Sequence, residues 1–198
     1  ALAPLVKASF SKSHYELALQ GLENTRLDDA INHFDHALEV DPAMVVALVG
    51  RGNCHFQMGT LDRAHADFTA AITMKPADPV VHARALLGRA EARISLDNPD
   101  AAIDDLTTVL DLRPRPADSQ LLAQCHRTRG YVLVARDNRT VGDLEAGIED
   151  FILAIDLDQA QEDALRVPLT QAFHDLGRMK MSQFDEKPGM PLINRVIE

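Results

Sequence analysis

The sequence repeats one short pattern at an interval of thirty-four residues. The first copy consists of Ala30, Phe34, Ala37 and Pro42, and the second consists of Ala64, Phe68, Ala71 and Pro76. Apolar residues three to four apart, followed by a proline, are typical of an amphipathic helix and its end. A period of this length indicates helix–turn–helix units that stack side by side. Such a chain is expected to present an extended surface to another polypeptide.

The composition favours this helical array and excludes other classes. The chain has 198 residues, no Trp and a formal net charge of −10. A general nucleic-acid binder needs a basic face, which this charge balance does not supply. No run of about eighteen apolar residues is present, so the sequence predicts no membrane span. Cys54 and Cys125 lack metal-ligand spacing, and we expect both to be buried free thiols.

The repeat unit can be followed along most of the chain. After an N-terminal extension (1–10), the sequence predicts four hairpins over residues 11–44, 45–78, 79–114 and 115–159. The last hairpin has a long turn at Arg136–Val141. A capping helix is expected over residues 160–184, kinked or restarted at Pro168, because an open array must cover its last apolar face. The tail, residues 185–198, is expected to be irregular or a short helix.

These residues resemble the tetratricopeptide repeat (TPR) family, whose pattern is Trp-x-x-Leu-Gly-x-x-Tyr, then Ala-x-x-x-Phe, Ala and Pro. Beyond the two copies above, Gly52, Leu87-Gly88 and Gly130 match it, whereas His55 and Glu91 stand where the family usually has Tyr. The resemblance covers about residues 11–160. It implies an all-α fold, a right-handed superhelical array of hairpins (an α-solenoid) with a C-terminal capping helix. The acidic charge and the even spacing count against the RNA-binding pentatricopeptide repeats.

In this family the first helix of each hairpin lines a concave groove that binds polypeptides. Carried onto this sequence, the resemblance implies a groove lined by Asn53, Phe56, Gln57, Arg89, Arg93, Arg127, Thr128 and Tyr131. Three arginines there would form a basic spot, and guanidinium groups bind carboxylates in bidentate fashion. On this hypothesis the partner segment carries acidic residues. The alternative is that these arginines form surface ion pairs with neighbouring Glu and Asp, each worth about 0–1 kcal/mol.

Family members that hold the C-terminal tails of Hsp70 and Hsp90 carry a carboxylate clamp built from Lys, Asn and Arg. The matching positions in this chain hold Tyr15, Leu19, Gly50, His82 and Leu86. The resemblance therefore implies no Hsp70/Hsp90 clamp.

The sequence contains few candidates for chemistry. His33 and His36 could supply two metal ligands from one helix face, but no third ligand is evident. Cys125 and His126 are adjacent, so on a helix they point apart and do not form a nucleophile–base pair. The segment 156–162 lacks the glycine of a calcium loop. We expect no metal, no cofactor and no enzymatic activity.

Two functions are consistent with the sequence. The first is a non-enzymatic scaffold that binds a partner through the groove. The second is a permanent accessory subunit of a large multiprotein complex, docked through the array and the tail. The chain begins with Ala1 rather than Met, which is consistent with a removed leader. On that ground we expect a mitochondrial or other import compartment, with the cytoplasm as the alternative.

Overall fold

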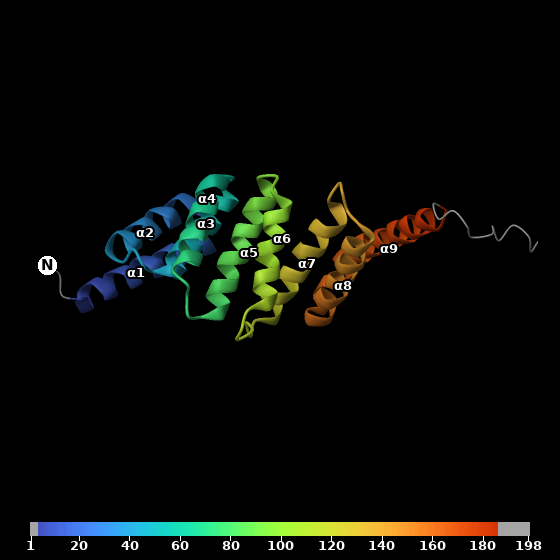
Figure 1. The fold of residues 1–198 in the computed structure, drawn as a ribbon. Helices are drawn as coiled ribbons and strands as arrows, with labels where there is room; N and C mark the ends of the chain where they lie inside the picture. The colour runs from blue at the N-terminus through green and yellow to red at the C-terminus, as the bar shows by residue number, and fades with distance from the viewer. Residues whose placement is uncertain (1–3, 186–198) are drawn as a thin grey trace, which may run out of the picture.

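The computed structural model describes residues 4–185, which form nine α-helices, one short 3-10 helix and no strand. The first two hairpins are α1 (Pro4–Glu23) with α2 (Leu27–Val40) and α3 (Val45–Gln57) with α4 (Leu61–Thr73). The next two are α5 (Pro79–Ser95) with α6 (Pro99–Asp111) and α7 (Ser119–Ala135) with α8 (Val141–Leu157). Figure 1 shows them side by side in chain order, as the predicted solenoid requires. No helix in this range is both long and apolar enough to cross a membrane.

The two ends of the array differ from the sequence-based boundaries. α1 already begins at Pro4, so most of the predicted extension is helical. Proline is well suited to a first helical position because its missing N–H would have no partner there. At the other end, the 3-10 helix η1 (Gln159–Gln161) leads into α9 (Glu162–Asp185), which continues through Pro168 without a restart. The predicted tail beyond Asp185 lies outside the described residues.

Side chains determine where the later helices begin. The Asp78 carboxylate accepts a hydrogen bond from the Val80 amide (2.8 Å) at the start of α5. Asn98 caps α6 in the same way, through the Ala101 amide. At α8, Thr140 and Asp143 form a reciprocal capping box. These caps fix the entry points of α5, α6 and α8 and hence their register against their neighbours.

The turn inside each of the first three hairpins has one residue in the left-handed region. These residues are Thr25 (φ 56°), Gly59 (φ 74°) and Asp97 (φ 59°). Gly59 lies thirty-four residues after Thr25, and Asp97 lies thirty-eight after Gly59. Only glycine adopts this conformation without a steric cost. The repeat therefore keeps its turn geometry even where the glycine has been replaced.

The helices form two layers. The first helices of successive hairpins touch one another (α1 with α3, α3 with α5, and α5 with α7), and we call them the inner helices. Each second helix, or outer helix, packs instead against the inner helix of the next hairpin. Among the described residues no two outer helices make a comparable contact. Because the inner helices are close and the outer helices are spread apart, the array curves toward the inner layer.

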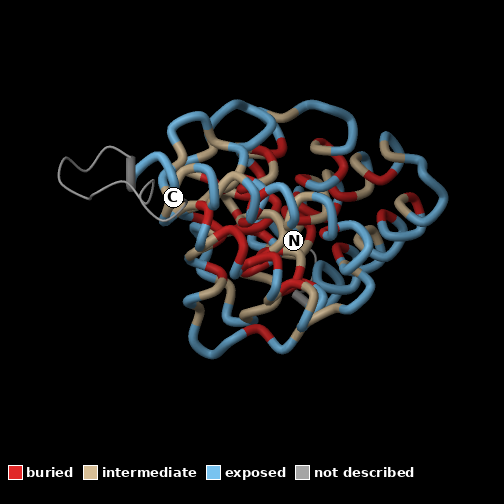
Figure 2. Tube along the Cα trace, turned by 90° about the vertical axis from the view of Figure 1, so that its right-hand side faces the viewer, coloured by how far each residue is buried: buried red, intermediate tan, exposed pale blue. Residues whose placement is uncertain are grey.

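Apolar side chains fill the space between the layers. Phe34, Phe68 and Phe151 are fully buried. Phe68 packs between Gly52 of α3 and Gly88 of α5, and a Cβ at Gly52 would lie only 2.9 Å from its ring. Figure 2 shows the buried residues gathered between the helices and the exposed loops at the rim. Cys54 and Cys125 are buried free thiols, as expected, and burial raises their pKa values to about 11 and about 12.

Candidate functional site

Two cavities open along the contact between the inner helices α5 and α7. The smaller cavity, of about 380 Å³, is lined by Asn53, Arg84, Leu87, Gly88, Glu91, Asp118, Gln120, Leu121 and Gln124. The larger one, of about 810 Å³, is lined by Ile94, Asp97, Pro99, Asp100, Arg127, Thr128, Tyr131, Val132, Ala135, Arg136, Asp137 and Asn138. The two cavities are adjacent, because residues one turn apart on each helix line different cavities. Glu91 and Gln124 line the smaller cavity, and Ile94 and Arg127 line the larger one. We call the surface formed by both cavities the α5–α7 seam.

Glu91 is a half-buried acidic group of the smaller cavity. Its Oε1 accepts a hydrogen bond from Gln124 Nε2 (3.2 Å). Burial raises the pKa of Glu91, and the hydrogen bond from Gln124 and the nearby charge of Arg127 oppose this shift. Within residues 4–185 no donor reaches Oε2. The carboxylate is therefore partly desolvated and still able to accept a further hydrogen bond.

The larger cavity combines exposed apolar side chains with a polar rim. Ile94 and Tyr131 are 36% and 40% exposed, and the Tyr131 ring meets the buried Phe151 edge-on at a centroid distance of 5.1 Å. Arg127 Nη1 donates to Gln161 Oε1 (2.8 Å), and Arg136 lies 3.2 Å from an Asp100 oxygen. Both arginines of this cavity are thus already bonded inside the protein. The other side chains that line this cavity are mainly apolar or acidic.

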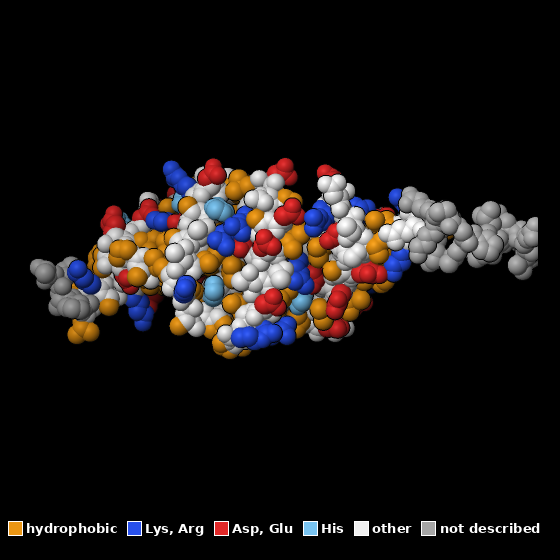
Figure 3. Space-filling view, in the orientation of Figure 1, with side chains coloured by type: hydrophobic (Ala, Val, Ile, Leu, Met, Phe, Trp, Pro, Cys, Tyr) orange, Lys and Arg blue, Asp and Glu red, His pale blue; other side chains and the backbone are white. Residues whose placement is uncertain are grey.

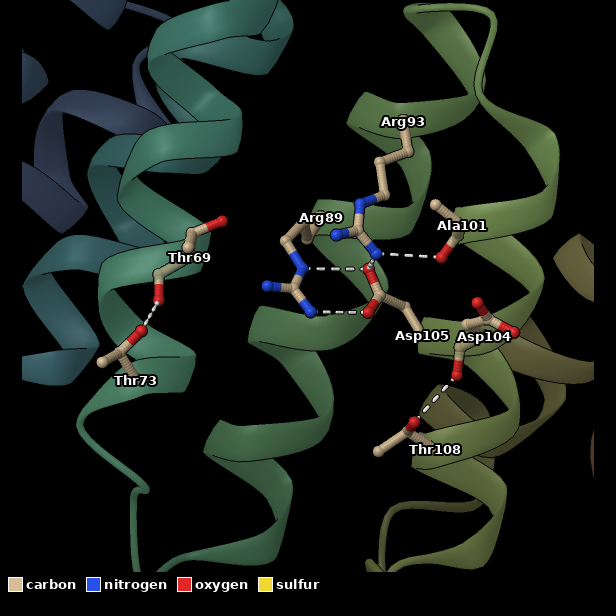
Figure 4. Close-up of polar contacts among 8 residues, drawn as sticks. All are labelled: Thr69, Thr73, Arg89, Arg93, Ala101, Asp104, Asp105 and Thr108. Atoms are coloured by element: carbon tan, nitrogen blue, oxygen red, sulfur yellow. Dashed lines mark hydrogen bonds and ion pairs between the residues drawn. The ribbon is translucent and has the colours of Figure 1, made fainter.

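Arg89 and Arg93 lie away from the seam and bind Asp105 of α6. Arg89 donates through Nε and Nη2 to the two carboxylate oxygens (2.9 and 2.6 Å), and Arg93 Nη1 donates to Oδ2 (2.6 Å). Figure 4 shows this arrangement between α5 and α6. The Asp105 side chain is only 5% exposed. These contacts support the alternative of ion pairs with neighbouring Asp, although the pairs are more buried than ordinary surface pairs.

The same bidentate contact recurs in the neighbouring hairpins. Arg51 binds Asp67 through Nε (2.9 Å) and Nη2 (2.6 Å), and Arg129 binds Asp150 through the same atoms (2.8 and 2.8 Å). We call these three contacts the Arg–Asp forks. The hydrogen bond to Asp67 raises the pKa of Arg51 above its ordinary value.

Two of the forks also reach the preceding outer helix. Arg51 Nη1 donates to Asp35 of α2 (2.6 Å), and Arg129 Nη1 donates to Thr107 of α6 (3.2 Å). An arginine of an inner helix thus bridges successive outer helices, which do not pack closely on each other. The Arg51 and Arg129 forks therefore hold adjacent hairpins together, whereas the Arg89 fork stays within its own hairpin.

The structure brings together four of the eight predicted groove residues. Asn53 lines the smaller cavity, and Arg127, Thr128 and Tyr131 line the larger one. The remaining four are placed elsewhere: Phe56 is half-buried against the first core cluster, Gln57 is exposed near the end of α3, and Arg89 and Arg93 bind Asp105. Their part in partner binding stays a prediction.

Sequence reasoning did not single out Glu91, Ile94 and Gln124 as seam residues. The spacing of the repeats could have identified Glu91 and Ile94. Aligned on their turns, where Asp97 follows Gly59 by thirty-eight residues, the third hairpin matches Asn53 with Glu91 and Phe56 with Ile94. This replaces the match of His55 with Glu91 that the family pattern implies. The same spacing matches Arg51 with Arg89. The shared sixteen-residue spacing of Arg51 to Asp67 and of Arg89 to Asp105 also indicates a structural pair. That spacing lengthens to twenty-one in the fourth hairpin because its turn is longer.

Charges of both signs are interspersed over the face shown in Figure 3, without one broad basic patch. The seam itself has a surplus of acid. Five carboxylates line its two cavities, against three guanidinium groups. No group of three or more His, Cys, Asp or Glu side chains in the described part of the chain is arranged to hold a metal ion.

The sequence is similar to known repeat proteins. Residues 15–79 match the family described as tetratricopeptide repeat. Human tetratricopeptide repeat protein 13 is 28% identical over 152 residues, which cover 74% of this chain and 16% of that protein. The chain thus spans only a small part of that relative's length.

Two solved structures share the fold. The 41-end fragment of MamA from Desulfovibrio magneticus RS-1 has a TM-score of 0.61 at 17% identity, and the match covers 87% of this chain and 96% of that one. YrrB, described as a TPR protein with an unusual peptide-binding site, has a TM-score of 0.57 at 17% identity, with 88% and 78% covered. The molecule is an α-solenoid of helical hairpins. The matched repeats over residues 15–79 and the similarity to the human relative support a tetratricopeptide repeat protein.

Proposed function

We propose that this protein binds a polypeptide segment of a partner along the α5–α7 seam. The TPR fold supports a protein–protein interaction scaffold, and the family and its structural neighbours are typically non-catalytic. The observation that supports the seam in particular is the exposure of Ile94 and Tyr131 beside the polar and charged side chains that line the same cavity. A cavity with an apolar floor and a few polar groups is the usual form of a binding site. The peptide-binding site in the printed description of YrrB supports the same class of ligand.

The sequence-based hypothesis of an acidic partner depends on three arginines. Two of them donate to Asp105, and Arg127 donates to Gln161. An acidic segment would have to compete with these internal acceptors. These three arginines therefore give no support to an acidic partner.

The proposal predicts that Tyr131→Glu abolishes partner capture. The substitution places a charge in the apolar part of the larger cavity, where a bound side chain would desolvate it. The matched control is Ile152→Glu on α8, because Ile152 is 43% exposed and lies outside both cavities. Immobilised full-length chains would be compared by pull-down with mass spectrometry. Bands lost only with Tyr131→Glu support the proposal, and equal capture by both variants would contradict it.

A permanent place in a larger assembly is the second candidate, and one observation favours it. Large apolar side chains are exposed on the terminal helices, with Leu5 of α1 at 85%, Val167 of α9 at 75% and Met181 of α9 at 70%. Exposed apolar surface of this kind often marks a lasting interface. Size-exclusion chromatography of the isolated chain separates the candidates. A scaffold with a transient partner elutes as a stable monomer, whereas an orphaned subunit aggregates or unfolds.

A further inference from the structure

We propose that the α5–α7 seam selects a basic segment, in which a Lys or Arg side chain binds Glu91 and a neighbouring large apolar side chain enters the cavity between Ile94 and Tyr131. This inference rests on the proposed function, because it names the chemistry of the partner at the same seam. It reverses the sign of the charge that the sequence alone predicts for that partner.

Glu91 provides the first reason. Its carboxylate is half-buried in the smaller cavity and has one hydrogen bond, from Gln124, with Oε2 open. Burial raises the pKa of Glu91, so its charge is incompletely compensated in the free protein. A cationic donor that enters the cavity supplies both the missing hydrogen bond and the missing charge.

The remaining charges of the seam provide the second reason. Each guanidinium group of the seam already has an acceptor: Arg84 has Asp118 (3.2 Å), Arg127 has Gln161, and Arg136 has Asp100. Three carboxylates, those of Glu91, Asp97 and Asp137, form no ion pair within residues 4–185, and the nearby charge of Arg127 only partly offsets the effect of burial on Glu91. An incoming basic segment therefore meets uncompensated negative charge. An acidic segment would have to break the ion pairs of Arg84 and Arg136, and of the three only Arg127, which donates to an uncharged amide, lacks a carboxylate partner in the described chain.

The geometry limits how the two side chains of the partner are spaced. Glu91 and Ile94 are three residues apart on α5, or about 4.5 Å along the helix axis. An extended segment advances about 3.3 Å per residue, with alternate side chains on one face. The basic and apolar side chains are therefore expected within four positions of each other in the bound segment.

A random twelve-residue peptide library displayed on phage provides a direct test. The library would be panned against the immobilised full-length chain and against Glu91→Gln, Glu91→Lys and Glu149→Gln. Glu149 is exposed on α8 and outside both cavities, so its variant changes the net charge equally without touching the seam. Circular dichroism would show that each variant is folded.

The inference predicts peptides enriched in Lys or Arg within four positions of a large apolar residue. For a synthetic peptide from this set, Glu91→Gln is expected to weaken binding at least about tenfold, the effect of losing a hydrogen bond between charged groups. Glu149→Gln is expected to bind like the wild type. Glu91→Lys is expected to select Asp and Glu in place of Lys and Arg.

Three other results would contradict the inference, and they differ in whether the proposed function also fails. Acidic peptides that lose binding with Tyr131→Glu would overturn the inference and leave the proposed function in place. Basic peptides that bind Glu91→Gln as well as the wild type would also overturn the inference, since the cation would then be held elsewhere. If no peptide is enriched, or if binding is insensitive to Tyr131→Glu, both the inference and the proposed function fail.

Discussion

The charged residues on the two flanks of α5 have different surroundings: those facing α6 form ion pairs within the described residues, and Glu91, which faces the seam, does not. On the outer flank, Arg89 and Arg93 are bound to the buried Asp105, so their charges are satisfied within one hairpin. On the inner flank, Glu91 has a single hydrogen bond to an uncharged amide and faces a cavity. The residues are only two positions apart, which on a helix turns the side chains to nearly opposite sides. The comparison teaches that a charge in this array indicates a binding surface only when no partner lies inside the protein.

Breaking the outer flank is expected to have the largest effect. Asp105→Ala leaves two partly buried guanidinium groups without their carboxylate partner, which typically costs about 3–5 kcal/mol of unfolding free energy. Urea unfolding followed by circular dichroism measures this. Asp104→Ala is the matched control, because Asp104 is exposed and its carboxylate has no partner among the described residues. A loss below about 1 kcal/mol for Asp105→Ala would mean that the fork behaves as an ordinary surface pair.

The inner flank is expected to contribute little to stability. Burial raises the pKa of Glu91, so the folded state holds its proton to a higher pH than the unfolded state does. Its ionisation therefore costs stability as pH rises above the ordinary pKa of a glutamate. Glu91→Gln removes this cost, and we expect unfolding free energy at pH 7 to stay within about 1 kcal/mol of the wild type or to rise. Urea unfolding at pH 7 and pH 4 provides the check, and a large loss would make Glu91 a structural residue.

The first hairpin extends the comparison, because it lacks an Arg–Asp fork. Leu17 and His33 occupy the positions of Arg51 and Asp67, thirty-four residues earlier. The contact between its helices includes His14 Nδ1 and His33 Nδ1, 3.2 Å apart, which requires at least one ring to offer a lone pair. Burial, followed by the charges of His36 and His33, lowers the pKa of His14. Acid therefore opposes this contact.

The smallest expected effect is a pH dependence of this hairpin. A depressed histidine pKa contributes stability above its ordinary value near 6.5, and this contribution is lost as pH falls through the folded-state pKa. The melting temperature should therefore drop between pH 7 and pH 5, and His14→Gln should reduce the drop. Part of it should remain, because burial also lowers the pKa of His55, His65 and His82. An unchanged pH profile for His14→Gln would contradict this account of the hairpin.

Much of the fold could be predicted from the sequence, because the same spacing of apolar residues recurs along the chain. The apolar spacing around Phe34 and Phe68 predicts helices whose bounds agree with α2 and α4 to within a few residues. The early start of α1 was not predictable in this way, because residues 4–10 carry no copy of the pattern. The direction in which each charged side chain faces was harder still. It depends on register. Matching Gly52 with Gly88 predicts Arg89 at the position of Asn53, whereas the thirty-eight-residue spacing of the turns places Glu91 there.

On our proposal, Glu91 of α5 binds the partner and Arg89 does not. The most direct test is the affinity of one selected basic peptide for two variants of the chain. Fluorescence polarisation at pH 7, at a temperature where both variants are folded, would compare Glu91→Gln with Arg89→Gln. We predict binding at least about tenfold weaker for Glu91→Gln and within about twofold of the wild type for Arg89→Gln. The opposite order, with Arg89→Gln losing the peptide and Glu91→Gln retaining it, would contradict the account.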